Sequence, residues 1–102
     1  MDMLGAKQPY EEYYVEFDFT NYLGTAHIDS IDEVSAVEMA SGEDETDAVT
    51  DATRQANDEH IVYVWIRAGE DGCRYKLNCR IIADDAEGSK YELDGILPVV
   101  ED

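Results

Sequence analysis

The strict alternation of apolar and polar residues between positions 73 and 81 constrains the fold more than any other feature of the chain. The apolar positions are Cys73, Tyr75, Leu77, Cys79 and Ile81, and the polar ones are Arg74, Lys76, Asn78 and Arg80. A period of two places all the apolar side chains on one face of a β-strand and all the polar side chains on the other. The segment therefore predicts a strand with one face on a hydrophobic core and the other in solvent.

Several further segments also have the pattern of strands. Residues 60–67, HIVYVWIR, are rich in β-branched and aromatic side chains and lie between polar turns. Both faces of this segment are apolar, which indicates a central place in a sheet or a position beneath another part of the protein. Residues 13–19 alternate, and residues 28–31 and 34–39 read as two short strands or as one bent strand. In the last segment, 90–100, Pro98 has no N–H to donate, which favours a sheet edge.

The region from Ser41 to Glu59 is polar and acidic. Ala48, Val49, Ala52 and Ala56 have helical spacing, but these residues are small and Thr and Asp interrupt them. We therefore expect an acidic loop with one short strand rather than a helix.

About seven short strands separated by turn signals predict an all-β fold, an antiparallel two-sheet β-sandwich, with a small open barrel as the alternative. Residues 1–8 are expected to form a flexible N-terminal arm, and residues 9–102 a single sandwich domain. The residues expected to form its core are Val15, Phe17, Val62, Val64, Ile66, Tyr75, Leu77, Ile81 and Leu93.

The charge of the chain bears on its partners and its location. Seven Lys and Arg against 25 Asp and Glu give a net charge of −18. Such a charge repels phosphate backbones and anionic lipid surfaces, so we expect neither nucleic-acid nor membrane binding. No apolar run has the length of a membrane span, and the first residues lack the pattern of a signal peptide. We therefore expect a protein made in the cytoplasm and not secreted by a signal peptide.

The two cysteines fit a reducing compartment. On one extended strand, Cys73 and Cys79 would lie about 20 Å apart, whereas a disulfide needs Cα atoms about 5.5 Å apart. Neither thiol has a recognisable histidine partner, and their spacing does not suit a metal site. Two buried thiols that act as small hydrophobic residues are the better interpretation.

The segment from Gly69 to Leu77 resembles the tyrosine corner of immunoglobulin-like and fibronectin type III sandwiches. In those domains a Gly- and Asp-rich turn leads into a strand, and a Tyr near its start hydrogen-bonds back across the corner. The resemblance places Tyr75 in this role, with its ring in the core and its hydroxyl on a buried backbone acceptor of the turn. The disulfide Cys of immunoglobulin domains is replaced by Leu77, and Trp65 lies on the preceding strand. The resemblance therefore implies an immunoglobulin-like fold without an antibody-type function.

A longer resemblance covers nearly the whole chain. Small acidic proteins encoded among phage head and neck structural genes have a similar series of short motifs, matched here by Lys7-Gln8-Pro9, Asp18-Phe19-Thr20, Leu23-Gly24, Ile28-Asp29-Ser30, Val62–Ile66, Gly69 through Tyr75, and Val99-Val100. Such proteins are accessory virion, fibre-like or neck-proximal components, and they bring no catalytic residues with them. The resemblance implies a non-enzymatic phage or prophage structural protein that contacts other virion proteins, in the host cytoplasm during assembly and then in the virion. The resemblance leaves open whether the protein forms a homo-oligomer.

Two sets of residues are candidates for an interaction surface. Exposed Tyr is enriched at interfaces, which draws attention to Tyr10, Tyr13, Tyr14 and Tyr22, although these rings could equally be core residues. The basic residues Arg67, Arg74, Lys76 and Arg80 could bind an acidic partner or an anionic ligand. The alternative for the basic set is cross-strand pairing with acidic neighbours such as Glu92 and Asp94.

Enzymatic and metal-dependent functions have little support. The chain has no phosphate-binding loop, nucleophile elbow or zinc pattern, so we expect no catalytic residue and no cofactor. The acidic runs at Ser41–Asp47 and Asp84–Glu87 lack the ligand pattern of an EF-hand, and we interpret them as solvated faces rather than metal sites. The alternative to a virion protein is an acidic inhibitor that mimics nucleic acid, for which net charge is the only support.

Overall fold

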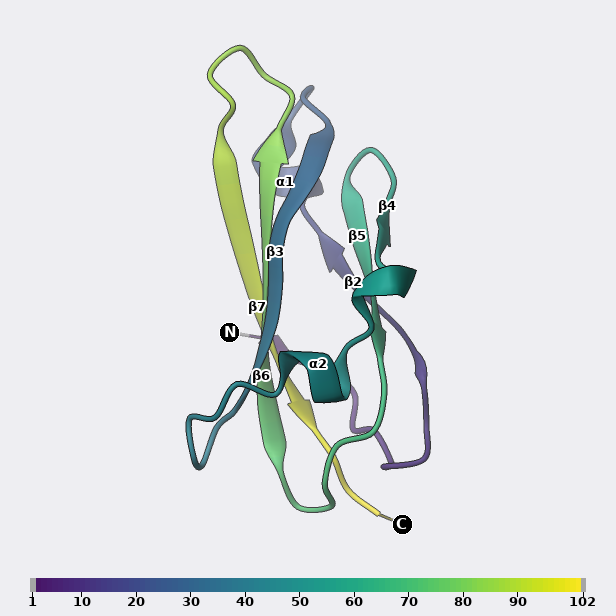
Figure 1. Ribbon diagram of the computed structural model, residues 1–102. Coiled ribbons are helices and arrows are strands. Elements are labelled where there is room, and N and C mark those ends of the chain that lie inside the picture. Colours follow the sequence, from purple (N-terminus) through teal and green to yellow (C-terminus); the bar gives the residue numbers. More distant parts are fainter. Residues whose placement is uncertain (1, 102) are drawn as a thin grey trace.

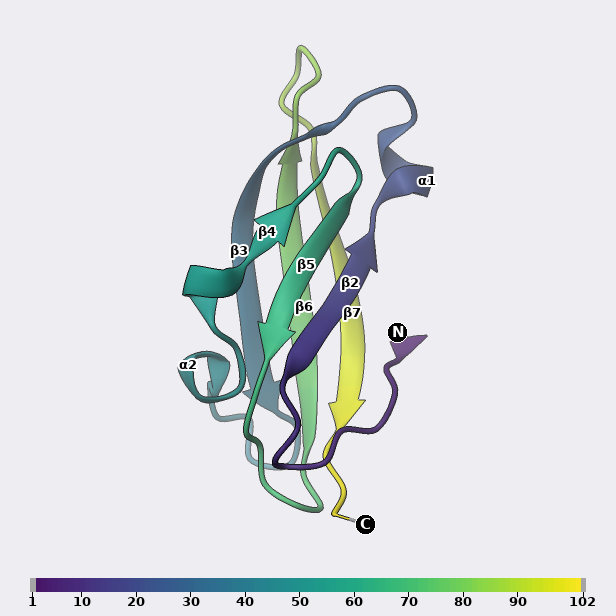
Figure 2. The same ribbon diagram turned by 90° about the vertical axis from the view of Figure 1, so that its right-hand side faces the viewer.

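Two β-sheets lie face to face in the computed structural model, which describes residues 2–101 (Figure 1). The larger sheet has the order β1-β7-β6-β3, and the smaller sheet has the order β2-β5-β4. The strands of the larger sheet are β1 (Asp2–Met3), β7 (Lys90–Pro98), β6 (Arg74–Ala83) and β3 (Ile28–Glu38). Those of the smaller sheet are β2 (Tyr13–Asp18), β5 (Ile61–Ile66) and β4 (Ala56–Asn57). The view in Figure 2 has the smaller sheet in front of the larger one, so the predicted all-β sandwich is confirmed.

The strand order matches the connection pattern of an immunoglobulin sandwich. If β2 to β7 are equated in chain order with strands B to G, the two sheets become B-E-D and G-F-C. All pairings among these strands are antiparallel, and only β1 runs parallel to its neighbour, β7.

The core lies between the inner faces of β5 and β6. The alternation on β6 has the expected phase, since Tyr75, Leu77, Cys79 and Ile81 are all at most 3% exposed. Val62, Val64 and Ile66 of β5 are fully buried against them, and each such aliphatic side chain contributes about 1.5–3 kcal/mol. β5 lies between β2 and β4, and its second apolar face is formed by the half-buried Ile61, Tyr63 and Trp65. Of the expected core residues, only Val15 and Leu93 are half-buried, at the margin of the core.

The bent-strand interpretation of residues 28–39 is the correct one. β3 is continuous from Ile28 to Glu38, with irregular register against β6 between Ile28 and Ser30 and between Ile31 and Glu33.

The acidic region after β3 contains more helix than predicted. It includes the single turns α2 (Thr46–Val49) and η1 (Ala52–Arg54, a 3-10 turn) before β4. Each turn starts from an Asp-x-Thr sequence: Asp44 Oδ1 accepts from the N–H of Thr46 at 2.9 Å, and Asp51 Oδ1 accepts from the N–H of Thr53 at 3.0 Å. These local hydrogen bonds start a turn, but the small apolar residues that follow do not extend it.

The N-terminal segment is held along β7. The N–H of Leu4 donates to Ile96 O at 2.8 Å, the N–H of Lys7 to Pro98 O at 2.9 Å, and the N–H of Val100 to Lys7 O at 2.8 Å. Residues 2–8 therefore do not form the free arm that was expected, and Met1 lies outside the described residues. The outer edge of β7 offers backbone groups that this segment pairs, and the missing N–H of Pro98 falls on this side, where no β6 partner needs it.

Candidate interaction surface

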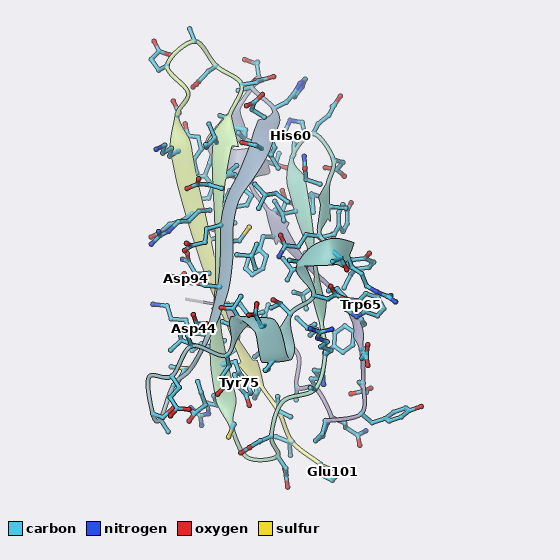
Figure 3. The ribbon with its side chains drawn as sticks, in the orientation of Figure 1. Asp44, His60, Trp65, Tyr75, Asp94 and Glu101 are labelled. Carbon is cyan, nitrogen blue, oxygen red and sulfur yellow. The ribbon has the colours of Figure 1, made fainter. Side chains whose placement is uncertain are left out.

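The outer face of the smaller sheet carries a row of aromatic side chains beside a row of acids. The register of β2 against β5 pairs Tyr14 with Trp65, Glu16 with Tyr63, and Asp18 with Ile61. All six side chains lie on the face of the sheet that points away from the core, and Trp65 can be seen there in Figure 3. We call the cluster of Tyr14, Tyr63 and Trp65 the aromatic face.

The aromatic face is a packed structure rather than a set of separate rings. The Tyr14 ring lies edge-on to Trp65, with centroids 4.9 Å apart, and edge-on to Tyr63 at 6.4 Å. The Tyr14 hydroxyl donates to Arg54 O at 3.0 Å, and the Arg54 guanidinium carbon lies 4.4 Å from the Trp65 ring centroid. Such a cation–π contact at an exposed site contributes about 0.5–1 kcal/mol. The 3-10 turn that presents Arg54 is therefore part of this surface.

Carboxylates surround the aromatic face. Trp65 Nε1 donates to Glu12 Oε1 at 3.2 Å, and the Tyr63 hydroxyl donates to Asp58 Oδ2 at 2.9 Å. The hydrogen bond to Asp58 raises the pKa of Tyr63, and the negative charges of Glu16 and Asp18 raise it further. The phenol therefore stays a hydrogen-bond donor in an acidic environment. A rigid, amphipathic and acidic surface of this kind suits contact with a basic protein surface.

Two of the three basic residues of β6 pair with acids of the same sheet. Arg80 Nε lies 2.9 Å from Glu92 Oε2, and its Nη1 lies 3.7 Å from Glu33 Oε1, so that the pKa of Arg80 is raised, mainly by Glu92. Lys76 Nζ lies 4.0 Å from Asp94 Oδ2. Arg74 forms no ion pair with the described residues. Cross-strand charge pairing thus accounts for Lys76 and Arg80 without a ligand.

The other candidate residues lie in separate places. Arg67 follows β5, where its Nη2 donates to Asp47 O at 2.8 Å and its Nη1 lies 3.6 Å from Asp51. Tyr10 is 95% exposed in the loop before β2. Tyr22, on the single turn α1 (Thr20–Leu23), is 51% exposed, and its ring lies 5.8 Å from that of Tyr91.

Only part of the Tyr set reaches the aromatic face. Tyr14 belongs to it, whereas Tyr13 packs against the core, and burial raises the pKa of its phenol. The eight candidates therefore do not form one surface. Tyr63, Trp65 and Arg54 were not among the candidate surface residues, although the alternation in β5 already placed Tyr63 and Trp65 on one face.

Lys7, the first residue of the Lys-x-Pro motif, is buried, which its charge would not suggest. Its side chain is fully buried, and Nζ donates to Gln8 O at 2.8 Å, to Pro9 O at 3.2 Å and to Ala68 O at 2.5 Å. Burial lowers the pKa of the ammonium group, while the nearby acids Glu11 and Glu12 act in the opposite direction. Lys7 thus connects the N-terminal segment to the turn after β5, where Ala68 has a positive φ of 51°. This contact gives the Lys-x-Pro motif a structural role.

Tyr75 closes the turn between β5 and β6. Its hydroxyl accepts a hydrogen bond from the N–H of Glu70 at 3.0 Å, and burial raises the pKa of the phenol. The backbone group satisfied by Tyr75 is therefore a donor, not the acceptor that was expected. Gly69 in this turn has a φ of 92°, and a Cβ there would lie 2.9 Å from a Val99 methyl group.

Two acids of the Asp84–Glu87 run accept hydrogen bonds from neighbouring groups of the fold. Asp85 accepts from the N–H and hydroxyl of Ser89 at 2.8 and 2.6 Å, and Asp84 accepts from the N–H of His27 at 2.8 Å. Within residues 2–101, no group of three or more His, Cys, Asp or Glu side chains is arranged to hold a metal ion. The helices of this same part of the chain are all too short to cross a bilayer.

The fold and its exposed face define a class of protein: a small all-β module with an aromatic, acidic surface of the kind used to contact other proteins. The family model described as "Podophage GP4 fiber-tail adaptor protein gp77" matches residues 7–93. The chain belongs to this family, and it is thus a phage structural protein of the adaptor type. No curated protein and no solved structure matches the chain.

Proposed function

We propose that this protein is a non-enzymatic virion component that joins a tail fibre to the tail of a podophage particle through protein–protein contacts. The family match over residues 7–93 carries this proposal. The aromatic face supports it, because Tyr, Trp and Arg clustered on a rigid sheet are typical of the central residues of an interface.

The finer classification as an immunoglobulin-like sandwich is part of the same proposal. It is supported by the B-E-D and G-F-C strand order and by the hydrogen bond between Tyr75 and Glu70. A sandwich of this type suits an adaptor because its sheets are rigid, so that exposed side chains are held in place at little entropic cost on binding.

Deletion of the gene from the phage that encodes this protein tests the proposed function. Purified particles should contain packaged DNA but lack tail fibres in electron micrographs and fibre protein in mass spectra. Complementation with the unaltered gene should restore both. Particles that carry a full set of fibres without this protein would refute the adaptor function.

A matched pair of variants tests whether the aromatic face is the contact surface. Tyr14 and Tyr22 are similarly exposed, at 45% and 51%, but only Tyr14 belongs to the aromatic face. Complementation with Tyr14→Ala should reduce the fibre content of the particles, whereas Tyr22→Ala should leave it unchanged. Equal effects of the two substitutions would argue against the aromatic face as the contact surface.

A further inference from the structure

The outer edge of β2 is an unpaired strand edge of regular geometry. β2 is six residues long, it pairs with β5 alone, and its register contains no irregularity. The other edge strands are less open: β1 and β4 have two residues each, and β3 has two register shifts. Figure 2 shows β2 at the side of the smaller sheet, with no strand beyond it in that sheet.

The hydrogen-bond pattern identifies the free backbone groups of this edge. The N–H of Phe19 donates to His60 O at 2.9 Å, which continues the β2–β5 register by one pair. Because backbone groups alternate in direction along a strand, residues 13, 15, 17 and 19 bond to β5. The N–H and C=O groups of Tyr14, Glu16 and Asp18 therefore point away from the sheet. None of them bonds to a backbone group elsewhere in residues 2–101.

The side chains along this edge set the chemistry of any strand that pairs with it. Tyr14, Glu16 and Asp18 lie on the solvent face, so residues directly opposite them on an added strand would point to the same face. Val15 and Phe17 point toward the core, so residues opposite them would meet apolar surface. An added strand would therefore alternate between basic residues, which pair with the carboxylates, and apolar residues.

The charges of the edge disfavour a second copy of the chain. An antiparallel β2–β2 pair centred on Glu16 would place the two Glu16 carboxylates opposite each other. Like charges opposite each other destabilise a sheet, and each chain carries a net charge of −18. Charged residues on an edge strand are a common protection against self-pairing. The same carboxylates favour a strand that carries Lys or Arg.

We propose that β2 accepts an extended, basic segment of another virion protein as an additional strand of the smaller sheet. Lys or Arg lies opposite Glu16 and Asp18, and apolar residues lie between them. Next to Tyr14, the segment contacts the edge of the aromatic face. Backbone pairing supplies affinity, and the alternating side chains supply specificity. This inference rests on the proposed function, because its partner is a component of the tail or the fibre.

A titration of the ¹⁵N-labelled protein with the peptide Lys-Val-Lys-Val-Lys-Val-Lys tests the proposal. The amide resonances of Tyr14, Glu16 and Asp18 should shift in a saturable way. The same peptide with alternate backbone nitrogens methylated along one edge keeps its charge but cannot form the ladder, and it should bind at least about tenfold more weakly. Equal binding of the two peptides, or shifts that map to another surface, would overturn strand addition.

Reversing a charge on the protein tests whether peptide binding depends on the carboxylates of β2. Glu16→Lys should weaken peptide binding at least about fivefold, whereas Glu43→Lys, with the same net charge, should have little effect. The amide spectrum shows whether each variant is folded, and Glu16→Gln replaces Glu16→Lys if the latter is not. An equal loss with Glu43→Lys would reduce the effect to general electrostatics and overturn the proposal. A β2-mediated dimer in light scattering would also overturn it, in favour of a second copy.

The particle assay separates this inference from the proposed function. If gene deletion removes the fibres but complementation with Glu16→Lys restores them fully, the adaptor function is supported and strand addition at β2 is refuted. If deletion leaves the fibres in place, the adaptor function is refuted. The peptide titration alone then decides whether β2 binds a basic strand.

Discussion

Tyr75 is the residue at which local sequence and fold are most closely connected. Its ring is 3% exposed in the core, and its hydroxyl reaches the N–H of Glu70, five residues before it in the chain. A turn that leaves a strand for the other sheet needs partners for its backbone groups, and this hydroxyl is one of them.

Substitution of Tyr75 by Phe should destabilise the protein without unfolding it. The ring remains in place, but the N–H of Glu70 loses its acceptor, which costs about 1–3 kcal/mol if water does not replace the hydroxyl. The measurement is a urea or thermal unfolding curve of Tyr75→Phe beside the unaltered protein, with the outward-facing Tyr63→Phe as the control for loss of a hydroxyl. An unchanged stability of Tyr75→Phe would remove the structural role that we assign to this hydrogen bond.

Lys7 should be more important for stability than any exposed lysine. In Lys7→Met the aliphatic part of the side chain is kept, but three carbonyl oxygens lose their donor, and we expect a loss of about 2–4 kcal/mol. The control, Lys90→Met, changes the net charge equally at an exposed position and should change the stability by less than about 0.5 kcal/mol. A Lys7→Met protein as stable as the control would show that the buried ammonium group contributes no net stabilisation.

At the scale of the elements, the N-terminal segment depends on a glycine of β7. A Cβ at Gly95 would lie 3.0–3.2 Å from three carbon atoms of the Leu4 side chain, whereas a Cβ at Gly5 would meet nothing within 4 Å. Gly95→Ala should therefore displace Leu4 from the edge of β7, and Gly5→Ala should not. Faster hydrogen exchange of the Leu4 amide in Gly95→Ala, with unchanged exchange in the centre of β6, is the expected result. Unchanged exchange at Leu4 would show that the segment adjusts without leaving β7.

The single helical turns use Asp-x-Thr sequences, and these make a prediction about pH. The pKa of Asp51 is lowered, first by the hydrogen bond from the Thr53 side chain, whose hydroxyl lies 2.6 Å away. Because the folded pKa lies below the unfolded value of about 3.9, this stabilisation is complete above that pH and is lost as the pH falls through the folded pKa. In Thr53→Ala the pKa of Asp51 should rise toward 3.9, as measured by the carboxyl ¹³C shift, whereas the distant Thr25→Ala should leave it unchanged. A pKa that is the same in Thr53→Ala would assign the effect to the N–H of Thr53 and to Arg67 and Arg54 instead.

The elements that could be predicted from the sequence are those set by local periodicity. The alternation in residues 73–81 fixed the buried face of β6, and the two apolar faces of residues 61–66 placed β5 between two strands. The N-terminal segment and Lys7 could not be predicted, because their partners lie far away in the chain: Ala68 is 61 residues from Lys7. The composition of the aromatic face could not be predicted for a related reason. Tyr residues that are close in sequence alternate between faces, while the aromatic face unites β2 with β5 and the turn η1.

At the scale of the whole molecule, the acidity of the chain has more than one use. Part of it is structural, since Asp18, Asp44, Asp51, Asp58 and Asp85 cap turns, and each of their pKa values is lowered by such hydrogen bonds. Another part balances the basic residues of β6. The remaining carboxylates, including that of Glu16 on β2, are free to repel other copies of the chain and to attract a basic partner.

The net charge also predicts how stability depends on salt. The molecule measures 45 × 23 × 22 Å, and the Debye length is about 30 Å at 0.01 M salt but about 10 Å at 0.1 M. At the lower concentration the carboxylates of a chain with a charge of −18 repel one another across most of the fold, whereas at the higher one only close neighbours interact. The melting temperature should therefore rise as sodium chloride increases from 0.01 to 0.1 M.

Calcium chloride of matched ionic strength distinguishes screening from specific binding. A specific site in the native state would stabilise it by mass action, with saturation near the dissociation constant. Because Asp44 and Asp85 of the Ser41–Asp47 and Asp84–Glu87 loops already accept hydrogen bonds from local N–H and hydroxyl groups, we expect the calcium and sodium melting curves to agree closely. A calcium-specific rise that saturates at micromolar concentration would mean that one of these acidic loops binds calcium, and that its acids are not simply caps of the backbone.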